Sequence, residues 1–180
     1  MLTRKEYMEA QVRAARMIEE AGIHITAEEE SRIEVIDFGL SALASEGAQI
    51  LTLFSTERVS AKVIALLPEQ TEPEHWHPAV GNDPGKEETI RVVAGTVYFY
   101  IPGNDNLQLG FVPAGKESCY TVHHELVMRS GDQITLEPGT KHWFQAGPEG
   151  AVMYTFSTCA RDILDQFTDP EIVRITRIVD

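Results

Sequence analysis

Apolar side chains recur every three or four positions at the start of the chain. The recurring positions are Met8, Val12, Ala15 and Ile18, with Tyr7 and Ala14 beside them. This spacing predicts one amphipathic helix over residues 3–21, with its apolar side against the rest of the molecule. Thr3 and Glu6 form a capping-box pattern at its start, and Gly22 is a suitable end. A second short helix is expected to begin at Thr26.

From about residue 32 the pattern changes to short runs rich in Val, Ile, Thr, Tyr and Phe, separated by Gly, Pro and Asn. The runs are 50–54, 59–67, 90–93, 96–101, 118–122, 133–136, 151–156 and 172–178. Short runs broken by turn residues predict an all-β sandwich or barrel. We therefore expect one domain over residues 1–180, with a helical extension at 1–31 and a β-barrel at 32–180. The helix would cover a sheet edge or form part of a dimer contact.

Composition and charge exclude several classes of protein. The 180 residues are 43% hydrophobic, as in ordinary globular domains. Fifteen Lys and Arg against 28 Asp and Glu give a net charge of −13, which argues against binding to nucleic acid or to an anionic membrane surface. Because no signal-peptide core or membrane-spanning run is present, we predict a cytoplasmic protein in which Cys119 and Cys159 are reduced.

Candidate metal ligands lie at three places in the predicted barrel. His75 and His77 are two residues apart, so a strand would place both imidazoles on one face. Glu88 opens a later strand that ends in a glycine turn, and His142 follows a Pro-Gly turn at the start of another strand. Three histidines and a carboxylate suit Mn, Fe, Co, Ni or Zn, whereas the lack of thiolate ligands argues against a closed structural zinc site.

These motifs resemble those of the cupin superfamily. Its first motif has His-x-His, then Glu, then Gly seven residues later, and its second has Gly followed three residues later by His. The steps from Glu88 to Gly95 and from Gly139 to His142 fit, and the first step favours Glu88 over Glu87 as the ligand. The insertion before Glu88 has ten residues rather than three or four. The resemblance implies a cupin-type, jelly-roll β-barrel.

Within the cupins, the chain resembles the D-lyxose isomerase family. The matching stretches are 54–62, 73–77, 85–89, 142–147 and parts of 156–170. The resemblance implies a small homodimeric enzyme, usually manganese-dependent, that converts an aldose such as D-lyxose to its ketose D-xylulose through an enediol. It also implies that His75, His77, Glu88 and His142 hold the metal ion.

Four further residues are candidates for catalysis and substrate binding. Lys86 precedes Glu88 by two residues, so its ammonium would stabilise a developing oxyanion or, with a lowered pKa, shuttle protons. Lys62 lies in an apolar strand and would either reach the cavity or extend to solvent. Phe144, two residues past the last histidine, would form an apolar wall for the sugar, and Asp165 is a candidate substrate-binding residue.

One position departs from the family pattern. Members tend to carry an acidic residue on the late strand, where this chain has Thr155. Glu137 and Asp165 are other carboxylates that would take the role of a base. Two alternative functions stay open: another cupin metalloenzyme, such as an iron dioxygenase or a sugar epimerase, and a non-catalytic metal- or sugar-binding cupin.

Overall fold

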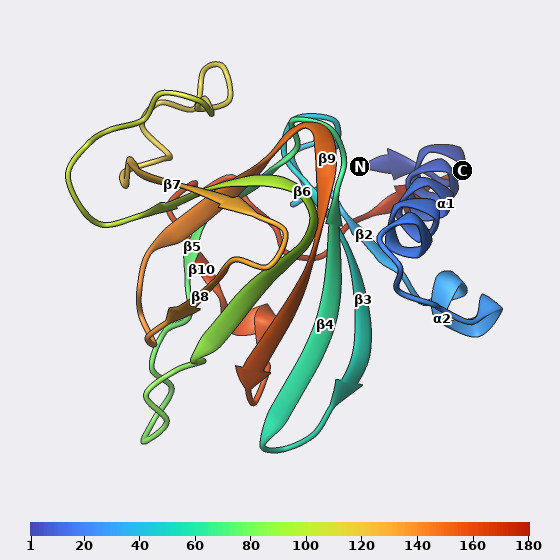
Figure 1. The fold of residues 1–180 in the computed structure, drawn as a ribbon, viewed down its shortest axis with the longest axis horizontal. Helices are drawn as coiled ribbons and strands as arrows, with labels where there is room; N and C mark the ends of the chain where they lie inside the picture. The colour runs from blue at the N-terminus through green and yellow to red at the C-terminus, as the bar shows by residue number, and fades with distance from the viewer.

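Most of the chain forms an antiparallel sheet that curls into an open barrel, with the helices on one side (Figure 1). The computed structural model describes residues 1–180. The strands of the barrel are β2 (Glu34–Ile36), β3 (Ala48–Ser55), β4 (Val59–Leu66), β5 (Thr71–Trp76), β6 (Glu88–Ile101), β7 (His124–Arg129), β8 (Gln133–Leu136), β9 (His142–Thr158) and β10 (Gln166–Phe167). The prediction of an all-β barrel with an N-terminal helical appendage is confirmed.

Strand β9 connects the two halves of the sheet. Along one edge it pairs first with β5 and then with β4, and along the other edge it pairs with β6. Its side chains alternate between the barrel interior and the outside within each half of the strand, and the alternation changes phase between Ala146 and Ala151, where the pairing with β6 shifts register. Phe144 and Met153 enter a core of 16 buried residues inside the barrel, whereas Trp143 points outward and stacks on Tyr100.

The N-terminal helix α1 (Arg4–Glu20) begins with the capping box predicted for Thr3 and Glu6. Helix α2 (Ala27–Ser31) is short, and Thr26 caps it. The buried stripe of α1 packs on outward side chains of β3, β4 and β9, so the helix covers a face of the sheet rather than an edge. This contact joins Ala14, Ala15 and Ile18 to Leu51, Val63, Ala65 and Val152.

The prediction that Met8 and Val12 face the core is wrong. Met8 is 56% exposed and Val12 is 53% exposed, because the side of α1 that touches the sheet is formed by alanines and Ile18. The start of the chain is also fixed by β1 (Leu2–Thr3), which pairs in parallel with β11 (Ile178–Val179) near the C-terminus.

Several predicted strands differ from the observed ones. Residues 90–93 and 96–101 are parts of the single strand β6, and 172–178 is irregular except at β11. Residues 118–122 form no strand; Tyr120 and Val122 are buried against Trp143 without a backbone ladder. A 3-10 helix, η1 (Asp162–Leu164), lies between β9 and β10. Both cysteines are free, and no helix is long and apolar enough to cross a membrane.

Candidate metal centre

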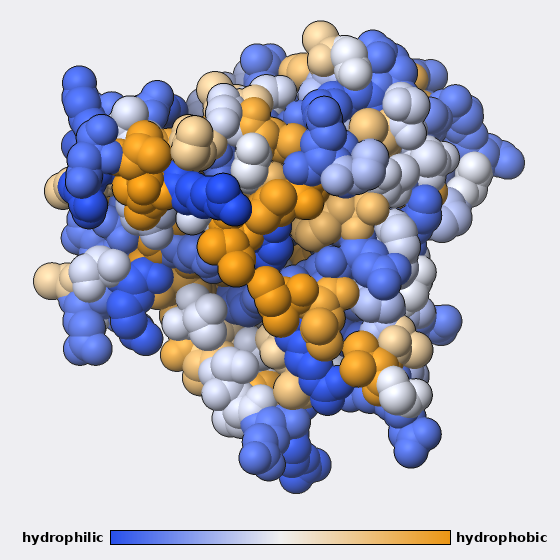
Figure 2. Space-filling view, turned by 180° about the vertical axis from the view of Figure 1, so that it is seen from behind, coloured by the Kyte–Doolittle hydropathy of each residue, from blue (hydrophilic) through white to orange (hydrophobic).

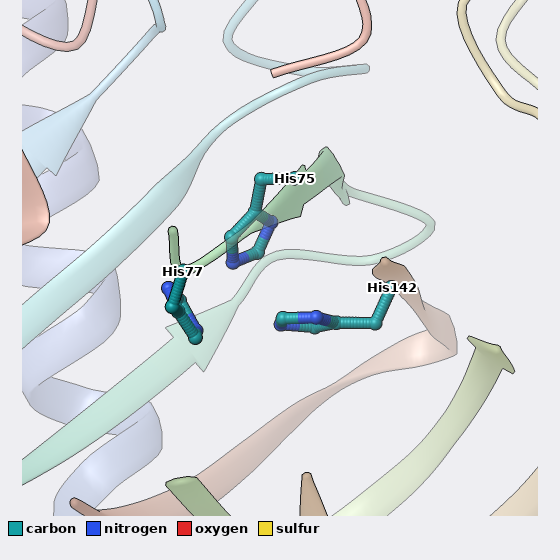
Figure 3. A group of neighbouring side chains, drawn as sticks. All are labelled: His75, His77 and His142. Atoms are coloured by element: carbon teal, nitrogen blue, oxygen red, sulfur yellow. The ribbon is translucent and has the colours of Figure 1, made fainter. Parts of the chain in front are cut away.

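Three buried histidines from two neighbouring strands meet at one end of the barrel. His75 lies in β5, His77 follows β5 directly, and His142 is the first residue of β9. Figure 3 shows their rings pointing toward one another, with ring centroids 4.2 to 5.2 Å apart. One potential ligand atom from each lies within 4.8 Å of the others. The expected convergence of His-x-His with the distant histidine is present.

Each histidine is oriented by a hydrogen bond from its Nδ1 to an acceptor outside the cluster. His75 donates to the Pro73 carbonyl (2.8 Å), His142 to the Thr140 carbonyl (2.9 Å), and His77 to Oδ1 of Asp165 (2.8 Å). Such bonds fix the tautomer and leave Nε2 available for a metal ion. Nε2 of His142 is buried and has no hydrogen-bond partner, which is the arrangement expected of a metal ligand.

Glu88 provides an oxygen next to this cluster. It opens β6 as expected, and its Oε2 lies 3.1 Å from Nε2 of His77, whereas Glu87 is exposed. Although burial alone would raise it, Lys86 and His77 hold the pKa of Glu88 well below its usual value. Burial, with the neighbouring His77, lowers the pKa of His142 to about 3. Burial also lowers the pKa of His75, whereas for His77 burial is outweighed by hydrogen bonds to Asp165 and Glu88, which raise its pKa. A carboxylate beside imidazoles, two of them held neutral, is a donor set that fits a divalent transition-metal ion.

Two glycines hold the loops around the cluster in place. The N–H of Gly139 donates to the carbonyl of His77 (3.0 Å), which ties the turn before His142 to the end of β5. Gly85 has φ +105°, and a Cβ there would lie 2.5 Å from the same carbonyl. A side chain at this position would therefore clash. The ten-residue insertion thus folds back against His77 and delivers Glu88 to the cluster.

Lys86 and Lys62 both lie at the site, buried beside acidic groups. Nζ of Lys86 lies 3.4 Å from Glu88 and 3.5 Å from Asp162, and Lys62 forms an ion pair with Asp162. Despite burial, Glu88, Asp165 and Asp162 raise the pKa of Lys86 above its usual value. Lys86 is therefore an ammonium at neutral pH. Lys62 reaches the cavity rather than solvent.

A narrow cavity adjoins His75 and Glu88 and is lined by most of the expected site residues. Phe144 lies in its apolar wall, and its polar wall includes Lys62, Glu72, Thr155, Asp162, Asp165 and Arg174. Glu137 is exposed in a turn and does not line this cavity, so its candidacy as a base is wrong. Sequence reasoning missed Glu72, Asp162 and Arg174 as cavity residues. Only Asp162 had a signal, because it lies within the stretches that resemble the family.

Solved structures of L-ribose isomerases have a similar fold. Cellulomonas parahominis L-ribose isomerase with no ligand superposes with a TM-score of 0.83 at 18% identity, covering 99% of this chain and 98% of the other. Acinetobacter sp. DL28 L-ribose isomerase in complex with L-ribose gives 0.81 at 17% identity, with the same coverage. At this identity, the likeness shows the fold alone.

No protein-family model matches the chain, but close relatives do. A D-lyxose ketol-isomerase from Cohnella laeviribosi is 50% identical over 171 residues, 94% of each chain. One from Thermofilum sp. (strain ex4484_79) is 46% identical over 99% of this chain and 100% of its own length. A D-lyxose/D-mannose isomerase from Thermosediminibacter oceani is 46% identical over all of both chains. The chain therefore belongs to the D-lyxose ketol-isomerase family.

Proposed function

We propose that this protein is a metal-dependent aldose–ketose isomerase that interconverts D-lyxose and D-xylulose. The observation that carries the proposal is the identity of 46–50% to D-lyxose ketol-isomerases along nearly the whole chain. D-mannose is a second proposed substrate, because a relative is named D-lyxose/D-mannose isomerase. The two sugars share their configuration at C2, C3 and C4, so a site that binds this part accepts both.

The proposed metal ligands are His75, His77, Glu88 and His142. Mn²⁺ is the proposed ion, and Fe, Co, Ni and Zn suit the same nitrogen and oxygen donors. When bound, the ion would act as a Lewis acid toward negative charge on a sugar oxygen. Asp165 supports this role by holding Nδ1 of His77, since such bonds keep a ligand oriented.

The remaining cavity residues have proposed roles toward the sugar. The Lys86 ammonium stabilises the charge that develops on an oxygen when the proton next to the carbonyl is removed. Lys62 and Asp162 donate to and accept from sugar hydroxyls, and Phe144 offers an apolar surface to the carbon chain. Asp165 also borders the cavity. Its Oδ1 is bound to His77, and its other carboxylate oxygen accepts a hydrogen bond from the substrate.

The experiment starts from protein stripped of metal with a chelator. Addition of Mn²⁺ and D-lyxose is expected to yield D-xylulose, whereas the stripped protein yields none. Formation of no ketose from any pentose or hexose would contradict the isomerase function. Oxygen consumption with Fe²⁺ would favour a dioxygenase, and sugar binding without turnover would favour a non-catalytic cupin.

We also propose that the protein is a cytoplasmic homodimer. The exposed Met8 and Val12 of α1 border a hollow lined by Leu2, Leu43 and Leu67. Seen from behind, the side of the molecule that holds α1 carries apolar side chains among charged ones (Figure 2). A contact between two copies through α1 would bury these side chains.

A further inference from the structure

A β-bulge turns Glu72 toward the metal centre. In the ladder between β5 and β9, Glu72 pairs with Phe144 and His75 pairs with His142. Three steps along β5 therefore match two steps along β9, so β5 contains one extra residue. Pro73 lies in this bulge, where a residue without an N–H is tolerated. The extra residue places Glu72 on the same inward face as His75.

The neighbouring acid, Glu74, points the opposite way. Its carboxylate accepts hydrogen bonds from Thr121, Val122 and Thr168 in the segments that cover the outside of β5. Glu74 is therefore fully used in holding those segments. Two glutamates of one strand, two positions apart, have different environments because only Glu72 faces the cavity.

Glu72 is buried, and its Oε2 has no hydrogen-bond partner. It lines the same cavity as His75, Glu88 and Lys86. An unpaired buried carboxylate oxygen is unfavourable for folding, so its presence calls for a functional explanation.

The other carboxylates of the cavity are already engaged. Glu88 contacts His77 and Lys86, and Asp165 holds His77. Asp162 pairs with Lys62 and lies near Lys86. Thr155 offers only a hydroxyl, which is a poor base at neutral pH. Glu72 is therefore the one carboxylate of this cavity that forms no hydrogen bond or ion pair with a neighbouring side chain, so it is free to take a proton.

The charges around Glu72 suit a reversible proton acceptor. Burial raises its pKa to about 7, the charge of Glu88 adds to the rise, Arg174 and Lys86 oppose it, and Asp165 adds a smaller rise. A carboxylate with a pKa near the working pH both accepts and returns a proton efficiently.

We propose, on the basis of the isomerase function proposed above, that Glu72 is the catalytic residue that moves the proton between C2 and C1 of the open-chain sugar. The Glu72 carboxylate takes the proton from C2 of the aldose. The electron pair of that C–H bond becomes the C1=C2 double bond, and the carbonyl π pair moves onto O1. Glu72 then returns the proton to C1 while the O2 hydroxyl proton passes to O1. The product is the ketose, and Glu72 ends as the carboxylate.

The test compares Glu72→Gln with wild type, both loaded with Mn²⁺ and given D-lyxose. The variant keeps the shape of the side chain but removes the base. We expect kcat to fall about 10²- to 10⁴-fold, the usual contribution of a positioned acid or base. In D2O, incorporation of deuterium at C1 of D-xylulose and at C2 of D-lyxose, followed by NMR, is expected to fall by the same factor. Bound Mn²⁺ per chain is expected to stay at the wild-type level.

Glu74→Gln is the matched control, because it changes the outward glutamate of the same strand. It is expected to keep kcat and deuterium incorporation near wild type, with only a lower thermal midpoint. A Glu72→Gln enzyme with kcat within threefold of wild type would overturn the proposal, as would loss of bound Mn²⁺ from that variant. If wild type itself forms no ketose, the proposed function fails instead, and this result is distinct from equal activity in both proteins.

Discussion

The interior of the barrel differs between its two ends. Along the inward face of β4 the side chains change from Lys62 to Leu66, and along β6 they change from Glu88 to Val92. Both strands pair antiparallel to β9 and so run in the same direction. Lys62 and Glu88 therefore lie at one end of the barrel, and the aliphatic Leu66 and Val92 lie toward the other.

This difference separates stability from chemistry. The aliphatic end buries apolar surface, which is the main favourable contribution to folding. The polar end buries charges that mostly compensate one another, and it leaves Nε2 of His142 and Oε2 of Glu72 unpaired. Unpaired buried atoms lower stability, so we expect substitutions at the polar end to affect function first and substitutions at the aliphatic end to affect folding first.

The largest expected effect comes from His142→Ala at the polar end. Removal of a ligand should weaken Mn²⁺ binding by more than the roughly 10- to 100-fold seen when only a ligand's supporting residue is changed. Ketose formation should disappear with the metal. Bound metal per chain and D-xylulose production are the measurements, with circular dichroism to verify the fold. Full retention of bound Mn²⁺ would show that the ligand set is wrong.

At the aliphatic end, Leu66→Ala should have the opposite result. Leu66 is fully buried in the inner core, and loss of a buried leucine side chain lowers the free energy of unfolding by about 2–5 kcal/mol. Urea denaturation of the metal-free protein measures this loss. Bound Mn²⁺ and KM for D-lyxose should remain near wild type at temperatures where the variant is folded. A variant of normal stability that fails to bind metal would remove the distinction between the two ends.

At the polar end, the sequence correctly predicts the residues that lie at the starts of strands. Glu88 and His142 were expected to open strands, and both do so. His75 and His77 were expected to share a face, and their rings do meet. These features follow from the alternation of side chains in a strand and from glycine turns, both of which are local.

The sequence did not identify Glu72 as a cavity residue, because a β-bulge in β5 changes the face on which its side chain lies. Strict alternation along β5 places a residue three positions before His75 on the opposite face. The bulge at Pro73 reverses that result, and its presence is visible only in the pairing with β9. Met8 and Val12 were wrongly expected to be buried for a similar reason. Helical spacing identifies the apolar side of a helix but not the part of that side that the sheet covers.

A smaller effect is expected from Lys62→Met, which breaks one ion pair at the polar end. Removing one partner of a buried pair is unfavourable by about 3–5 kcal/mol, but here Lys86 and Arg174 also face Asp162, so the loss should be smaller. Although burial raises it, Lys86 and Lys62 bring the pKa of Asp162 down to about 2.

The pH dependence of stability tests this pair. In the unfolded chain an aspartate has a pKa of about 3.9. Since the folded pKa of Asp162 is lower, its contribution to stability is complete above about pH 4 and is lost as the pH falls toward 2. In Lys62→Met the folded pKa should rise, so thermal midpoints of the metal-free variant should vary less with pH between 2 and 4. Identical pH profiles for the two proteins would contradict a coupling between Lys62 and Asp162.

The smallest effect on the barrel is expected from the double substitution Met8→Glu and Val12→Glu on α1. Both side chains are more than half exposed, so the free energy of unfolding of one chain should change by no more than about 0.5 kcal/mol. Two added carboxylates on each copy would meet at a contact through α1 and repel, so the variant should be a monomer. Sedimentation equilibrium on wild type and variant measures the mass. Arg58→Glu, which makes the same change in net charge in the exposed turn between β3 and β4, is the control. A wild-type dimer that survives the double substitution would place the dimer contact on another surface, whereas a monomeric variant that keeps its isomerase activity would show that each barrel holds a complete site.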